Sequence, residues 1–223
     1  MKRWQILSAA LVAVCIGCAP SIKIMTEFHD DSFSFGKLNG KKIKVFVSDN
    51  VNLTEFKNAF QKEYQSDRQF AAAIRSQIVD SAQSIIGATA GAADSMQDIN
   101  SLLSTSFDSA AINRVQTMFT TSGDDFFLIV KAVDISNKMS QNATVYTGQP
   151  GTGGMYMGGG SSESCIITMH VEMWNVKEKK KVLSFSSMGD SKVVMLFFGT
   201  ALKNAVRDAV VHMLKYLVTG AID

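Results

Sequence analysis

Few residues of this chain have the types and spacing that metal binding or acid–base chemistry requires. The 223 residues include only three histidines. His170 and Glu172 lie two positions apart in an alternating run, so both project from one face of a strand and could supply two ligands to a metal ion. The other histidines, His29 and His212, lie in distant segments and provide no supported third ligand. We therefore expect a half-exposed strand face at His170 and Glu172, and no metal.

The remaining polar motifs indicate turns rather than catalytic groups. Asp124-Asp125 comes directly before an apolar run, where paired acidic residues are typical of a turn. No serine stands in the G-x-S-x-G motif of a nucleophile elbow, and no nucleophile has a plausible base. The sequence therefore predicts a protein that is not an enzyme, with no catalytic residue and no cofactor.

A glycine-rich segment, GQPGTGGMYMGGG, spans residues 148–160. A phosphate-binding loop needs its glycines between a strand and a helix, followed by Lys-Ser or Lys-Thr. Here a strand-like run follows and neither dipeptide is present, which argues against nucleotide binding. We expect residues 140–163 to form a flexible loop that joins two neighbouring strands, because glycine runs resist a single backbone conformation.

Two alternatives for this loop involve binding. Aromatic and methionine side chains suit adaptable contacts, so the loop could order on a partner or on a membrane surface. The residues that would make this contact are Tyr146, Met155, Tyr156 and Met157. A transmembrane hairpin donated to an oligomeric barrel is the other alternative, but it needs about 9–11 alternating residues per strand. The glycines of residues 148–160 leave too few apolar side chains for a strand that faces lipid.

The first 17 residues have the layout of a signal peptide. Lys2 and Arg3 give a positively charged start, and an apolar run extends from residue 6 to residue 16. This run is about half of the roughly 20 residues that cross a bilayer, so cleavage is favoured over a retained anchor. Cys15 and Cys18 close the run, whereas Cys165 stands alone and can form no internal disulfide once Cys18 is modified. We expect Cys165 to be buried and unreactive.

Residues 15–18, Cys-Ile-Gly-Cys, resemble a bacterial lipobox, although Cys15 stands where leucine is usual. The resemblance implies that residues 1–17 are removed and that Cys18 carries a covalent lipid, including palmitate. Cys15 is not the modified residue, because Val14 is too bulky for the position before the cut. Ala19 replaces the acidic residue that retains many lipoproteins at the inner membrane, which implies the periplasmic face of the outer membrane. The alternative is an ordinary secretory signal with incidental cysteines.

The charge and length of the mature chain restrict its class. Removal of residues 1–17 leaves 20 basic against 20 acidic residues, so the mature domain lacks the basic footprint that nucleic acid requires. A hydrophobic fraction of 46% is typical of a globular protein. We expect a lipidated leader over residues 18–33 and a single α/β domain over residues 34–223.

Hydrophobic periodicity predicts the elements that carry these residues. Strand-like alternation or apolar runs cover residues 42–48, 126–135, 165–174 and 181–188. Helical spacing covers residues 67–86 after a Ser66 cap, residues 95–119, and a final helix from a Thr200 cap to Gly220. The Ala/Gly/Thr-rich residues 87–94 read as a loop. This order predicts an α/β (α+β) sandwich in which helices pack on one mixed sheet.

The apolar run Val193-Val194-Met195-Leu196-Phe197-Phe198 comes directly before the last predicted helix. We expect it to be an edge strand or a connection tucked into the core. If part of it is exposed instead, the two phenylalanines mark a surface that contacts a partner or a second copy.

Three segments carry a resemblance to a known group: GKKIKVFVSDN, DDFFLIVKAVDI, and the stretch from IITMHVEMWNV to the final helix. In this order they resemble envelope lipoproteins such as CsgG and LpoB, built on a domain like the amino-terminal domain of TolB. The resemblance implies a non-enzymatic periplasmic lipoprotein, anchored to a membrane, that acts by contact with envelope proteins in assembly or regulation. The alternative is a subunit of an oligomeric CsgG-like secretion pore, hence a homo-oligomer. No functional residue of these families is carried over.

Overall fold

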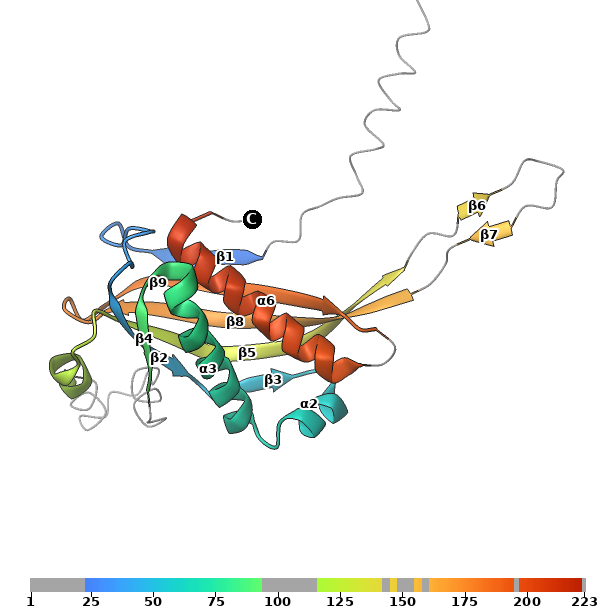
Figure 1. Ribbon diagram of the computed structural model, residues 1–223, viewed down its shortest axis with the longest axis horizontal. Coiled ribbons are helices and arrows are strands. Elements are labelled where there is room, and N and C mark those ends of the chain that lie inside the picture. The colour runs from blue at the N-terminus through green and yellow to red at the C-terminus, as the bar shows by residue number, and fades with distance from the viewer. Residues whose placement is uncertain are drawn as a thin grey trace, which may run out of the picture.

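A mixed seven-stranded sheet with helices packed on it forms the framework of the protein (Figure 1), which confirms the predicted fold class. The structure is a computed structural model that describes residues 23–93, 116–141, 145–147, 155–157, 161–194 and 197–221. The strands of the main sheet are β1 (Ile24–His29), β2 (Lys42–Val47), β3 (Val51–Leu53), β4 (Thr89–Ala92), β5 (Phe126–Gln141), β8 (Ser161–Asn175) and β9 (Lys180–Lys192). The helices are α2 (Lys57–Glu63), α3 (Asp67–Ile86) and α6 (Phe198–Thr219).

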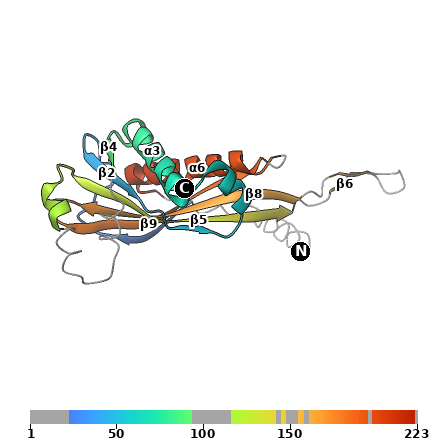
Figure 2. The same cartoon turned by 90° about the horizontal axis from the view of Figure 1, so that it is seen from below.

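The sheet has the order β1-β9-β8-β5-β2-β4, and β3 pairs with β5 beyond the end of β2. Strands β4, β2 and β5 are parallel, whereas β5, β8, β9 and β1 are joined antiparallel. Figure 2 shows α3 and α6 together on one side of this sheet. The opposite side is called the open face below.

The alternation in β8 shows how the sheet separates its two faces. The residues predicted for its core side are all fully buried under the helices: Cys165, Ile167, Met169, Val171 and Met173. Their neighbours in sequence project from the open face, among them His170 and Glu172. At one end of the open face a smaller apolar cluster forms around Phe46, Phe127 and Ile129.

The helices have the predicted spans with one correction. Helix α3 covers Asp67–Ile86 as predicted, and the αL conformation of Gly220 ends α6. Helix α6 begins at Phe198, so the prediction that Thr200 caps it is wrong. The ring of Phe198 packs against Phe56 with centroids 5.4 Å apart, and this tertiary contact sets the first turn where no side chain caps it.

Three expected irregular segments contain strands. The predicted leader, residues 18–33, contains β1, and the predicted loop at residues 87–94 contains β4. Both are short edge strands that pairing with β9 and β2, rather than their own pattern, holds in place. Residues 140–163 do join two neighbouring strands, but β5 and β8 extend into that segment.

A two-stranded sheet also lies within residues 140–163, and the flexibility of this segment stays a prediction. Strands β6 (Val145–Thr147) and β7 (Met155–Met157) pair antiparallel, and Figure 1 shows them set apart from the body of the protein. Valine, tyrosine and threonine have the high β-propensity that overrides nearby glycines. In the predicted helical region 95–119, residues 116–121 are helical and residues 94–115 lie outside the described residues.

The Ser66 cap of α3 gives a first prediction. The Ser66 side chain accepts a hydrogen bond from the backbone N–H of Gln69 at 3.2 Å. Ser66→Ala removes this acceptor, and we expect the free energy of unfolding to fall by about 1 kcal/mol in urea denaturation. Ser76→Ala, at an exposed position of the same helix, is the control and should change it by less than about 0.5 kcal/mol. Equal effects of both changes would contradict the capping role.

Candidate functional site

A polar network around His170 occupies the open face between β1, β5, β8 and β9. His170 Nε2 lies 2.7 Å from Asp134 Oδ2, and His170 Nδ1 lies 3.0 Å from Ser186 Oγ. The hydroxyls of Ser184 and Ser186 both donate to the carboxylate of Glu27 at 2.9 Å. Each strand therefore contributes a side chain that is bonded to a neighbouring strand.

The arrangement of Ser186, His170 and Asp134 has the residue types of a nucleophilic triad. A serine nucleophile must give its proton to the imidazole. Ser186 instead donates to Glu27, and it is 5% exposed. The geometry therefore supports a role in joining strands. That the protein is not an enzyme stays a prediction.

Glu172 lies at the centre of a second group on the open face. Its carboxylate is 2.9 Å from Lys131 Nζ and 3.3 Å from Lys181 Nζ, and it accepts a hydrogen bond from Trp174 Nε1 at 3.0 Å. Glu172 is only 6% exposed. Burial by itself raises the pKa of Glu172, but the hydrogen bonds from Lys131 and Trp174 and the two lysine charges outweigh it and lower the pKa.

The structure places His170 and Glu172 on the same face, as predicted, but gives each its own partners. Burial raises the pKa of Asp134, yet the hydrogen bonds from His170 and Asn52 lower it overall. Burial also raises the pKa of Glu27, and the hydrogen bonds from Ser184 and Ser186 lower this pKa overall. Among the residues that the structure describes, no three His, Cys, Asp or Glu side chains are placed to hold a metal ion.

Cys165 is fully buried, as predicted. Burial, with a smaller contribution from the charge of nearby Glu163, raises the pKa of its thiol to about 12. The thiolate is the nucleophilic form, so burial and the raised pKa both disfavour reaction at Cys165.

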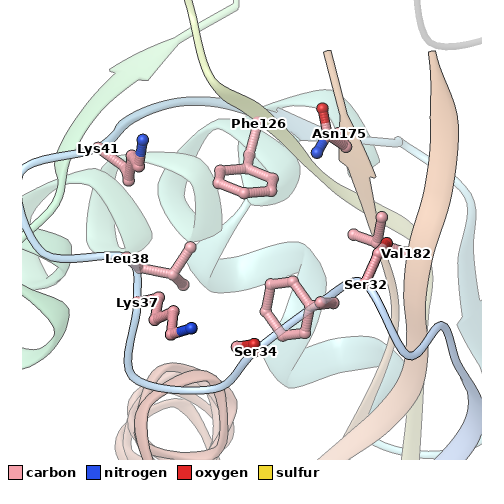
Figure 3. A pocket seen from close by; sticks show the side chains of 9 residues that line it. Ser32, Ser34, Lys37, Leu38, Lys41, Phe126, Asn175 and Val182 are labelled. Carbon is pink, nitrogen blue, oxygen red and sulfur yellow. The ribbon is translucent and has the colours of Figure 1, made fainter. Parts of the chain in front are cut away.

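A small pocket opens between the segment after β1 and the start of β5 (Figure 3). It has a volume of about 210 Å³ and is lined by Ser32, Phe33, Ser34, Lys37, Leu38, Lys41, Phe126, Asn175 and Val182. Phe126 and Leu38 point into it, and Lys41 Nζ lies 3.4 Å from a carboxylate oxygen of Asp125. Pockets for small molecules usually enclose roughly 300–1,000 Å³. The size and the paired lysine argue against a substrate site here.

A larger groove of about 570 Å³ lies at the end of the body from which the β5–β8 pair extends. It is lined by Thr54, Glu55, Phe56, Lys57, Asn58, Ala59, Glu163 and Phe198. Beside it, three large apolar side chains are exposed: Met139 by 59%, Val194 by 61% and Phe197 by 64%. Met139 pairs with Glu163 across β5 and β8, which places it at the groove. We call these three residues and the groove the distal patch.

The distal patch corrects the expectation that residues 193–198 are buried. Val193 packs on the core, but a turn in which Phe197 N–H donates to Val194 C=O at 2.9 Å leads the chain into α6. This turn leaves Val194 and Phe197 outside. The groove itself is lined by two aromatic residues, Phe198 and Phe56. Phe56 was not a predicted site residue, and its backbone has a positive φ of 62°. No pattern in the sequence marks it.

The predicted partner-binding residues lie together in the small sheet of β6 and β7. Tyr146 pairs with Tyr156, and Val145 and Thr147 pair with Met157 and Met155. Their role in partner binding stays a prediction. The lipidation site, Cys18, lies outside the described residues. None of the described helices is long and apolar enough to cross a bilayer.

Comparisons with known proteins show likeness only among solved structures. No family model and no curated protein matches the chain. The chain is similar to the PelC dodecamer from Paraburkholderia phytofirmans, with 12% identity over 87% of this chain and 96% of that one and a TM-score of 0.43. It is similar to a putative neuraminyllactose-binding hemagglutinin homolog from Helicobacter pylori, with 10% identity over 88% and 93% of the two chains and a TM-score of 0.39.

The chain is also similar to the lipoprotein GNA1162 from Neisseria meningitidis, with 10% identity over 73% of this chain and 93% of that one and a TM-score of 0.33. These structural neighbours therefore include a bacterial lipoprotein and PelC. Their low identities and TM-scores carry no argument about what this chain does.

Proposed function

We propose that this chain is a lipid-anchored protein of the outer membrane, on its periplasmic face, that acts by contact with other envelope proteins. The lipobox-like residues 15–18 support the anchor. Several acyl chains on Cys18 would hold the domain to a bilayer, since one chain alone binds only marginally. The anchor raises the effective concentration of the domain near partners on the same membrane.

The distal patch is the observation that carries contact with proteins. Soluble domains rarely expose several large apolar side chains side by side unless a partner covers them. Two carboxylates, Glu55 and Glu163, outnumber the one cation, Lys57, that lines the groove, so the partner would present an apolar segment with a basic residue. The resemblance to CsgG and LpoB agrees with this function and remains a prediction.

Replacement of the anchor residue tests the first part of the proposal. We expect Cys18→Ser to leave a folded protein that no longer sediments with membranes, because the thiol that accepts lipid is gone. Cell fractionation and mass measurement of the mature amino terminus are the readouts. Ala19→Ser, which leaves Cys18 in place, is the control. Sedimentation of the Cys18→Ser chain with membranes, or an unacylated wild-type amino terminus, would contradict the anchor.

A second experiment tests the contact surface. Val194→Ser with Phe197→Ser should abolish crosslinks to envelope proteins in intact cells and leave the melting temperature within about 2 °C, because both side chains are exposed. Val218→Ser, at an exposed apolar position of α6, is the matched control and should keep the crosslinks. Crosslinks that persist in the double variant would argue against the distal patch.

The alternative function, a subunit of a secretion pore, predicts a different assembly. The mass of the lipidated protein in mild detergent should correspond to one or two copies if the protein is an adaptor. A ring of many copies would favour the pore and make a second copy of this chain the partner at the distal patch.

A further inference from the structure

We infer that the open-face side of β1 rests on the phospholipid bilayer, with Met25 and Phe28 in the headgroup layer. This inference rests on the proposed lipid anchor and goes beyond it, because it names the surface that meets the membrane. Met25 is 59% exposed and Phe28 is 41% exposed. They are two of the six large apolar side chains that the described part of the chain exposes.

The tether is too short to let the domain stand away from the membrane. Only residues 19–22 separate Cys18 from Lys23, where the described fold begins. Five extended residues span at most about 18 Å. Lys23 is fixed to the domain, because its C=O accepts from Met188 N–H at 2.7 Å and its ammonium contacts Asp190 and Asp208. The anchor therefore holds the β1 edge of the sheet close to the lipid.

A bulge in β1 directs its apolar side chains to one side. Met25 pairs with Ser186 and Phe28 with Ser184, and the register shifts between Thr26 and Phe28. The extra residue, Glu27, turns its carboxylate to the two serine hydroxyls of the open face. Met25 and Phe28 therefore lie on the same side of the strand, one on either side of a carboxylate that already has donors.

Basic groups beside these side chains suit phosphate headgroups. Lys181 Nζ lies 5.7 Å from the ring centroid of Phe28, which places a cation next to the apolar contact. Lys131 and Lys181 both contact the carboxylate of Glu172, and the charge of Lys131 also acts on Glu27, so two lysines and two carboxylates lie together beside Met25 and Phe28. Apolar tips next to cations are typical of surfaces that lie in the membrane interface.

This placement orients the protein on the membrane. With the open-face side of β1 on the bilayer, β4, at the opposite edge of the sheet, lies farthest from the tether. Because β1 pairs antiparallel with β9 and lies along the bilayer, the strands run roughly along the membrane and the distal patch at their end faces sideways. A protein anchored to the same membrane could reach the patch in this orientation.

Depth measurement on the full lipidated chain tests the inference. Met25→Cys and Phe28→Cys each provide a thiol for an environment-sensitive dye, since Cys18 is acylated and Cys165 is buried. On vesicles of phosphatidylethanolamine and phosphatidylglycerol, we expect blue-shifted emission and quenching by spin-labelled lipid at both positions. Ser76→Cys on α3 is the control, and its dye should show at least about threefold less quenching because it stays in water.

The outcomes separate this inference from the proposed function. Dyes at positions 25 and 28 that stay aqueous while the protein floats with the vesicles would overturn the inference and leave the anchor intact. Energy transfer between dyes on different copies, without quenching by lipid, would also overturn it and assign β1 to a second copy. A protein that does not float and carries no acyl group would overturn the anchor itself.

A second pair of variants covers the case in which the dye disturbs the surface. In the unlipidated Cys18→Ser chain, Met25→Ser with Phe28→Ser should lower partitioning to the same vesicles by about tenfold, because two apolar side chains no longer leave water. Val194→Ser with Phe197→Ser should leave partitioning unchanged. Equal losses in both double variants would overturn the assignment to β1.

Discussion

Gly189→Ala should lower the free energy of unfolding by about 3 kcal/mol, a large effect for one added methyl group. Gly189 lies in β9 under α6, where the strand and the helix meet backbone to backbone. A Cβ at this position would lie 2.2 Å from Ala205 O and 2.2 Å from Ala209 N. Backbone atoms cannot turn aside as a flexible side chain can, so the whole helix would have to move.

The neighbouring contacts show why that movement is costly. Ser187 Oγ donates to Ala209 C=O at 2.8 Å, and Asp190 N–H donates to an Asp208 carboxylate oxygen at 3.1 Å. Both bonds join β9 to α6 on either side of Gly189, and both stretch if the helix lifts. Protein interiors are packed as densely as organic crystals, so a displacement of α6 from β9 is passed on to the surrounding side chains.

Gly91→Ala is the matched control for this prediction. Gly91 is also a strand glycine, but a Cβ there meets nothing within 4 Å. Urea denaturation of both variants should therefore show a large loss of stability at Gly189 and a change below about 0.5 kcal/mol at Gly91. Similar small changes at both positions would mean that β9 and α6 are not in the close contact described.

Elements with their own periodicity could be predicted, and elements that depend on their neighbours could not. Helix α3 has a cap at Ser66 and a regular apolar stripe, and its predicted bounds are confirmed. Strand β1 has five exposed residues out of six and no clear alternation, so only its pairing with β9 identifies it. The short segments β3 and α2 were missed for the same reason.

The candidate surfaces divide in a similar way. Cys18 belongs to a local motif, so four adjacent residues suffice to predict it. The exposure of Phe197 depends on the turn into α6, and the first residue of that helix, Phe198, packs on Phe56, which lies 142 positions earlier in the chain. Apolar runs are usually buried, so the sequence alone predicted that residues 193–198 lie in the core. Met25 was not predicted as a contact residue, because it lies in the segment that was predicted to be the leader.

The second large effect is expected at Glu172. Glu172→Gln keeps the size of the side chain but removes the charge that two lysines face. Removing one partner of a buried ion pair costs about 3–5 kcal/mol. Both lysines are about one-third exposed, so water screens part of the loss. We therefore expect the free energy of unfolding at pH 7 to fall by about 2 kcal/mol, with Glu55→Gln, on the exposed side of the groove, as a control near zero.

The pH dependence separates the charge of Glu172 from its packing. Its pKa is lower in the folded protein than the unfolded value of 4.5, so its carboxylate stabilises the fold fully above that value. This stabilisation is lost as the pH falls through the lower, folded pKa. The difference between wild type and Glu172→Gln should therefore be constant from pH 6 to pH 8 and shrink below about pH 4.5. Glu27, Asp134 and the other acidic groups are present in both proteins, so their own contributions cancel to first order in this difference. A difference that stays the same at low pH would show that packing of the side chain, rather than its negative charge between Lys131 and Lys181, stabilises this part of the sheet.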